Sequence, residues 1–156
     1  MKKEFYFSLL VMLCFSLMSS SCSNNDDDGG VIDNSEQIAQ VENTVESGTW
    51  RITNFIDSGE NETSDFAGYN FSFNSDGSLD ATNGTDTLTG TWSVTDDSSS
   101  SDDDIDFNIF FPVPDTNDFE DLNDDWDIVS YTSTRIELID ISGANARTDK
   151  QTFEKN

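Results

Sequence analysis

Residues 69–94, YNFSFNSDGSLDATNGTDTLTGTWSV, contain three stretches in which apolar and polar residues alternate. Alternation with a period of two is typical of strands that bury one face. The apolar or small positions are Tyr69, Phe71 and Phe73, then Leu79 and Ala81, then Leu88, Gly90, Trp92 and Val94. Between the stretches, Asn74-Ser75-Asp76-Gly77 and Asn83-Gly84-Thr85 are typical of hairpin turns. These residues therefore predict three antiparallel strands joined by two hairpins.

The same alternation continues on both sides of this stretch. The further strands are predicted at Trp50/Ile52, Ile105–Phe111, Trp126/Ile128, Ile136/Leu138 and around Phe153. Eight strands joined mainly by short turns predict an all-β fold, an eight-stranded antiparallel meander barrel over residues 48–156. One departure is Gln151, which stands where an apolar partner of Phe153 is expected and leaves the last strand weakly specified.

A short helix is predicted before the barrel, over residues 35–47. Asn34-x-x-Gln37 has the form of a capping box, and Gly48 is placed as a C-cap. Ile38, Val41 and Val45 follow helical spacing. The fold prediction is thus a barrel preceded by one amphipathic helix.

Residues 1–21 have the features of a signal peptide. Lys2 and Lys3 precede an apolar run over residues 5–18, which is shorter than the about 20 residues that a membrane-spanning helix needs. Ser19-Ser20-Ser21-Cys22 resembles the looser lipobox of Bacteroidetes lipoproteins, which implies cleavage before Cys22 and lipid attachment to its sulfur. The alternative is an ordinary cleaved signal peptide followed by a chance cysteine.

Residues 22–34 are expected to form a flexible acidic tether. They include Asn24-Asn25-Asp26-Asp27-Asp28-Gly29-Gly30, which has nothing to bury. An acidic cluster just after a lipidated cysteine is similar to the signal that exports Bacteroidetes lipoproteins to the outer face of the outer membrane. The resemblance implies a protein on the cell surface; a solvated spacer on a protein of the periplasmic face is the alternative.

The charge of the chain excludes several function classes. It has 7 Lys and Arg residues, 32 Asp and Glu residues and no histidine, for a net charge of -25. Such a chain repels nucleic acid, and it lacks the imidazole that serine and cysteine triads use. Its acids lie mainly in loops with little apolar shielding to raise a carboxyl pKa. We therefore expect a protein that is not an enzyme.

Gly48-Thr49-Trp50 recurs as Gly90-Thr91-Trp92, with the Phe71–Gly77 hairpin between them. This order resembles the lipocalin-like domain of Bacteroidetes lipoproteins. The resemblance implies a barrel and, within it, binding of a small apolar or sugar-like ligand, with no catalytic residues. Trp50, Phe71 and Trp92 are the candidate ligand-binding residues, and core packing is the alternative role for the tryptophans.

Two further candidate sites depend on short patterns. The 13 acidic residues from Asp96 to Asp127 could bind calcium through their carboxylate oxygens, although they do not form an EF-hand loop. The best candidates for this site are Asp121, Asp124, Asp125 and Asp127. Solvated charge is the alternative, and no other cofactor is expected. Asp86-Thr87-Leu88 resembles an O-glycan acceptor, which implies glycosylation of Thr87 unless it simply begins a strand.

Two functions follow, and the contents of the barrel separate them. A cavity lined by Trp50, Phe71 and Trp92 favours a carrier of a small ligand. A barrel filled by its own side chains favours a non-catalytic surface module, whose acidic face binds cations or a protein or glycan partner. Phe110, Phe111 and Val113 break the alternation, which indicates exposed apolar surface at a barrel mouth or at a dimer or partner contact; a loop folded under the domain is the alternative. The oligomeric state is left open.

Overall fold

The computed structural model describes residues 34–96, 105–142 and 147–156, all within one compact unit, residues 32–156. The predicted signal peptide 1–21, the tether except Asn34, and Cys22 lie outside the described residues. Among the residues that are described, no helix is long and apolar enough to span a membrane.

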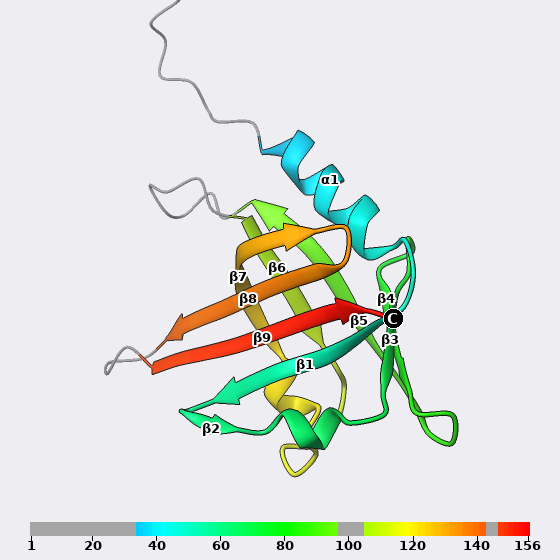
Figure 1. The fold of residues 1–156 in the computed structure, drawn as a ribbon, viewed down its shortest axis with the longest axis vertical. Helices are drawn as coiled ribbons and strands as arrows, with labels where there is room; N and C mark the ends of the chain where they lie inside the picture. Colours follow the sequence, from blue (N-terminus) through cyan, green and yellow to red (C-terminus); the bar gives the residue numbers. More distant parts are fainter. Residues whose placement is uncertain (1–33, 97–104, 143–146) are drawn as a thin grey trace, which may run out of the picture. The chain divides into compact units, whose positions relative to one another are not determined.

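Eight antiparallel strands form a closed barrel, as predicted from the alternation (Figure 1). Each strand from β3 to β8 pairs with the next along the chain, and β1 pairs with both β3 and β9. The strands are β1 (Trp50–Asp57), β3 (Asn70–Phe73), β4 (Ser78–Thr82), β5 (Thr87–Asp96), β6 (Ile105–Phe110), β7 (Asp124–Thr132), β8 (Arg135–Ser142) and β9 (Arg147–Lys155).

The two pairings of β1 differ in length. Its pairing with β9 runs from Trp50–Lys155 to Ile56–Lys150, with a register shift between Ile52 and Asn54. Its pairing with β3 is the single pair Trp50–Phe71. The free end of β1 pairs instead with β2 (Glu60–Asn61), a strand that the sequence did not predict because two residues cannot show a period.

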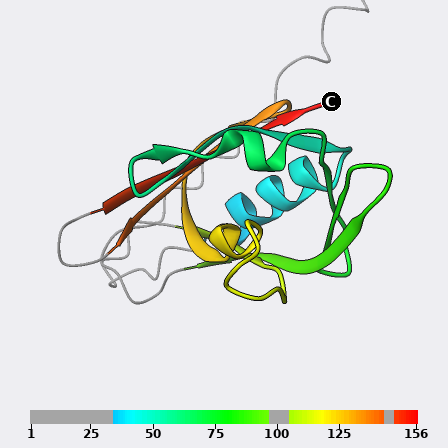
Figure 2. The ribbon, with the colours of Figure 1, turned by 90° about the horizontal axis from the view of Figure 1, so that it is seen from below.

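Helix α1 (Ser35–Val45) precedes the barrel, two residues shorter than predicted, and buries Val41 and Val45. The predicted capping box is wrong: the Asn34 side chain makes no cap bond and donates from Nδ2 to Asp96 Oδ1, 3.0 Å away on β5. The C-cap is Glu46, not Gly48. Seen from below, α1 lies across the ring of strands (Figure 2).

Gly48 is required by its backbone conformation rather than by the helix end. Its φ is +147°, a value that residues with a side chain rarely adopt. Gly90 is required by a close approach, because a Cβ at that position on β5 would collide with the Phe110 carbonyl oxygen of β6. The two glycines of the repeated Gly-Thr-Trp pattern therefore serve different purposes.

The three tryptophans fasten connecting segments to the barrel. Trp50 Nε1 donates to the Val45 carbonyl oxygen of α1 at 2.8 Å, and Trp92 Nε1 donates to that of Asn74 in the β3–β4 turn at 3.0 Å. Trp126 Nε1 donates to the Leu122 carbonyl oxygen, 3.1 Å away in the 3-10 helix η2 (Glu120–Leu122). Each indole thus buries its ring and satisfies its one donor.

The end of the barrel opposite α1 is closed on the β1–β3 side. There η1 (Thr63–Phe66) buries Phe66, whose ring centroid lies 5.4 Å from that of Phe119, just before η2. Phe119 also contacts Phe71 and Phe111. Ring packing replaces strand pairing where β1 and β3 part.

Candidate functional site

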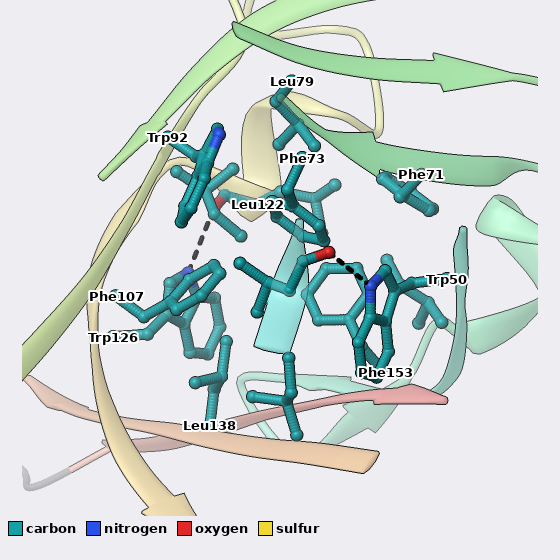
Figure 3. Packing of buried hydrophobic residues seen from close by; sticks show 14 of the residues in the cluster. Trp50, Phe71, Phe73, Leu79, Trp92, Phe107, Leu122, Trp126, Leu138 and Phe153 are labelled. Carbon is teal, nitrogen blue, oxygen red and sulfur yellow. Dashed lines mark hydrogen bonds between the residues drawn. The ribbon is translucent and has the colours of Figure 1, made fainter. Parts of the chain in front are cut away.

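The three predicted ligand-binding residues lie inside the barrel and are covered. Trp50 and Phe71 have no exposed surface, and Trp92 is 7% exposed. Figure 3 shows them among the buried side chains that project from the strands into the core. Trp50 and Trp92 therefore pack in the core, which is the alternative role predicted for them from the sequence.

Neighbouring aromatic rings occupy the interior around these residues. Phe73 lies at the centre, with ring centroids 5.4 Å from Trp92, 5.5 Å from Phe107 and 5.4 Å from Phe153. Phe153 is in turn 5.4 Å from Phe71. Separations of 4.5–7 Å are those of rings in contact. This part of the barrel is filled by its own side chains.

A groove lies on the outside of the sheet. It has a volume of about 540 Å³, and its lining includes Thr53, Val129, Arg135, Glu137, Lys150 and Glu154. These residues belong to β1, β7, β8 and β9. We call the outer surface of β1, β8 and β9, with Val129 at its margin, the mixed-charge face.

The mixed-charge face holds three of the basic residues of the chain, Arg51, Arg135 and Lys150, at outward positions. Apart from Lys2 and Lys3, the remaining basic residues are Arg147 and Lys155 on β9; Lys155 Nζ lies over the Trp50 ring and donates to Ser47 Oγ. Sequence patterns missed this clustering. Alternation predicts that Arg135 and Glu137 point outward, but only barrel closure brings β1 beside β9.

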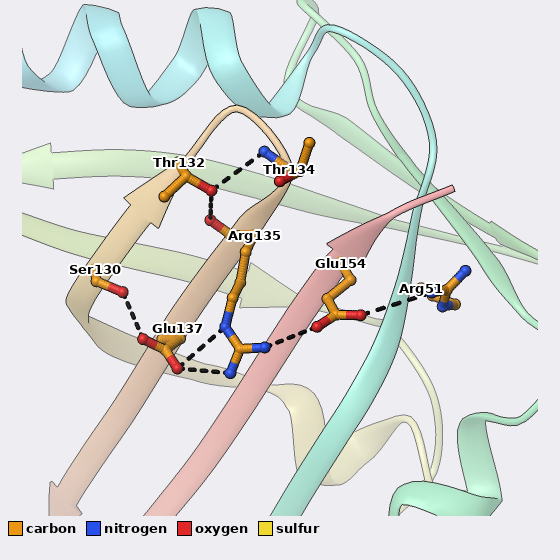
Figure 4. Close-up of polar contacts among 7 residues, drawn as sticks. All are labelled: Arg51, Ser130, Thr132, Thr134, Arg135, Glu137 and Glu154. Carbon is orange, nitrogen blue, oxygen red and sulfur yellow. Dashed lines mark hydrogen bonds and ion pairs between the residues drawn. The ribbon is translucent and has the colours of Figure 1, made fainter.

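Charged groups on this face are held in a network (Figure 4). Arg135 Nη2 lies 2.7 Å from Glu137 Oε1, and its Nη1 lies 2.7 Å from Glu154 Oε1. Arg51 Nη2 lies 3.6 Å from Glu154 Oε2. Ser130 Oγ donates to Glu137 Oε2 at 2.6 Å, and this bond, followed by Arg135, lowers the pKa of Glu137. The result is a fixed pattern of alternating charges.

Apolar side chains are exposed beside these charges and at one other place. Val129 is 60% exposed, and Ile141 on β8 is also exposed. Phe110 is 54% exposed at a second outer groove of about 450 Å³, which Thr91 and Asn108 also line. The predicted exposure of apolar surface near Phe110 is thus confirmed for Phe110, whereas Phe111 is buried.

The four aspartates of the predicted calcium site are not brought together. On β7, Asp125 and Asp127 flank the buried Trp126 and point outward, whereas Asp124 lies on the inward side. Asp121 lies in η2. Within residues 34–96, 105–142 and 147–156, no group of three or more Asp, Glu, Cys or His side chains is arranged to hold a metal ion.

Negative charge is nevertheless concentrated at the end of the barrel opposite α1. Desolvation, followed by interactions with Asp125 and repulsion from Asp140, raises the pKa of Asp124 from 3.8 to about 6. Desolvation and then repulsion from Asp57 raise the pKa of Asp121. Desolvation, followed by repulsion from Asp121, likewise raises the pKa of Glu62.

Thr87 and Cys22 are the remaining predicted sites. Thr87 begins β5, is exposed, and donates from Oγ1 to Thr82 Oγ1 at 3.2 Å. A strand start and an accessible hydroxyl coincide here, so both interpretations of Asp86-Thr87-Leu88 stand. Cys22 lies outside the described residues.

Comparisons with known proteins find one solved structure to report. No protein-family model matches the chain, and no curated protein matches it. The chain is similar to the crystal structure of a DUF4847 family protein from Bacteroides vulgatus, at 21% identity and a TM-score of 0.46. The match covers 74% of this chain and 97% of the other. The barrel assignment itself comes from the strand pairing of this chain.

Proposed function

We propose that this chain is a lipocalin-like lipoprotein of the Bacteroidetes type, anchored in the outer membrane through acyl chains on Cys22 and facing the cell exterior. Its barrel is a non-catalytic interaction module that presents the mixed-charge face to a protein or glycan partner. The observation that carries this proposal is the filled interior around Trp50, Phe71 and Trp92. A carrier of an apolar ligand needs a cavity where these rings pack.

The mixed-charge face has the features of a recognition surface. Complementary charge patterns select partners and orient them more than they add affinity. Arg135, Glu137 and Glu154 supply such a pattern beside a groove of about 540 Å³. The exposed Val129 adds apolar area that a partner would cover. Elsewhere the chain is strongly acidic, so this face differs in kind from the rest of the surface.

A second candidate function is binding of a sugar-like ligand at the groove beside Phe110. An exposed aromatic ring offers an apolar surface with a quadrupole, and Thr91 and Asn108 offer hydrogen bonds around it. Phe110→Ala should abolish retention on immobilised glycans while changing stability little. Retention that survives the substitution would remove this groove as the binding site.

The lipid anchor is tested in cells. We expect Cys22→Ala to prevent incorporation of labelled palmitate and to release the protein from the membrane, since thioether attachment needs that sulfur. Incorporation of palmitate into the variant would show that the anchor assignment is wrong.

The soluble Cys22→Ala protein also tests the partner surface, by binding to cells that lack the native protein. In that background, Lys150→Gln and Thr85→Glu each make the net charge more negative by one. Lys150 lies in the groove, whereas Thr85 lies in the β4–β5 turn. We expect Lys150→Gln alone to weaken binding. Equal weakening by both substitutions would indicate bulk repulsion, and no effect of Lys150→Gln would remove this face as the partner surface.

A further inference from the structure

Gln151 is a polar side chain inside an apolar barrel. It is 1% exposed on β9, and its register partners on either side are Phe55 of β1 and Leu138 of β8. Both Oε1 and Nε2 are buried and have no hydrogen-bond partner among the described residues. Buried polar groups in native proteins are nearly always paired, because an unpaired one loses its bonds to water without compensation.

A second unpaired group lies next to it on the neighbouring strand. Leu138 pairs with Gln151 and Asp140 pairs with Asp149, so Asp140 is two residues along β8 on the same inward side as Gln151. Asp140 Oδ2 is buried and likewise has no partner within the described part of the chain. Two acceptors and one donor, from two adjacent strands, are therefore left facing the interior.

The charges around these atoms restrict what can bind them. Asp124 lies close enough for Asp140 to raise its pKa. Asp149 already accepts a bond at Oδ1 from the backbone N–H of Ser58, 2.6 Å away. An anion would meet these carboxylates, and a purely apolar molecule would leave Gln151 and Asp140 unpaired. A metal ion is disfavoured because no three acidic, Cys or His side chains among the described residues are arranged to hold one, and the Gln151 amide N–H would face it.

We infer that Gln151 and Asp140 form an internal binding site for a small neutral hydroxyl compound, either water itself or a small hydroxylated solute. The hydroxyl hydrogen is donated to Asp140 Oδ2 or Gln151 Oε1, and the hydroxyl oxygen accepts from Gln151 Nε2. Buried water making two to four such bonds is the usual solution for groups of this kind. The site goes beyond the proposed function, in which the barrel interior has no binding role.

The test is an NMR measurement of side-chain amide groups in the 15N-labelled soluble protein. Gln151→Met identifies the Gln151 signal by its disappearance. Asn123 supplies a matched control, because its Nδ2 donates to the Phe111 carbonyl oxygen at 3.0 Å and its Oδ1 accepts from the Phe111 N–H. We expect magnetisation transfer from long-lived water to the Gln151 amide and none to that of Asn123.

Glycerol, as the hydroxylated probe, separates the two sources of the hydroxyl group. A water site gives the cross-peak without a glycerol-dependent shift. A solute site gives a saturable shift of the Gln151 signal that Asp140→Asn weakens and that Asn123 does not share. Absence of both effects, together with a melting temperature raised several degrees by Gln151→Met, shows a dry, unpaired amide and overturns the inference.

Discussion

The interior of the barrel near α1 and its interior near the start of β7 follow the same alternation but contain different chemistry. Near α1, Trp50 and Phe71 are fully buried. Toward the other end, the inward positions of β7, β8 and β9 include Asp124, Asp140 and Gln151. Because buried apolar area dominates folding free energy, the buried rings should contribute far more stability than these polar inward positions. Inward orientation alone does not make a position part of the core.

The largest expected effect is at Trp50, near α1. Trp50→Ala should lower the free energy of unfolding by about 3–5 kcal/mol, because it removes a fully buried ring and the bond that holds α1 at Val45. Urea denaturation monitored by circular dichroism measures this loss. We expect a comparable loss for Trp92→Ala. A mild loss at either position, accompanied by abolished uptake of an apolar probe, would instead show that the ring faces a ligand.

At the other end of the barrel, the free energy of unfolding should depend on pH through Asp124, whose ionisation opposes folding. Because folding raises the Asp124 pKa from 3.8 to about 6, the folded state binds the proton more tightly. The contribution of this group is therefore favourable below pH 3.8 and is lost as the pH rises through about 6. Such a shift corresponds to about 3 kcal/mol. Screening at this half-buried side chain reduces the expected effect to about 1 kcal/mol.

Asp124→Asn should thus stabilise the protein at pH 7 by about 1 kcal/mol, and this advantage should shrink toward zero at pH 3.5. Melting curves of both proteins across this range measure the difference. Asp115→Asn, at an exposed position between β6 and η2, is the control. A constant advantage at all pH values would assign the effect to something other than Asp124 ionisation.

The smallest loss of stability is expected on the outer surface of the barrel, at the mixed-charge face. Arg135→Gln breaks ion pairs with Glu137 and Glu154, but their side chains are well exposed and such pairs contribute little to stability. The melting temperature should fall less than in either tryptophan variant, and high salt should remove the difference. A loss as large as that of Trp50→Ala would show that this network supports the fold rather than a partner surface.

Periodicity was sufficient to predict the barrel strands. The inward residues of β6, Ile105, Phe107 and Ile109, are all buried. Contacts between distant segments were the part that periodicity could not supply. Asn34 matched a helix-capping pattern, yet its side chain donates a hydrogen bond to Asp96 on β5. The calcium prediction also relied on proximity in sequence, and among the described residues no group of three or more acidic, Cys or His side chains is arranged to hold a metal ion.

The pairing of β1 with β9 has a consequence for how the chain folds. Trp50 of β1 pairs with Lys155 of β9, about a hundred positions away along the chain. The pairing of β1 with β3 consists of a single residue pair. The hairpins from β3 to β9 are local and form without β1, but the ring cannot close until residues 147–155 are available. Non-local closure of this kind raises contact order and slows folding. Until then, the edges of β1 and β8 remain open to wrong partners, so a chain truncated before β9 should be prone to aggregation.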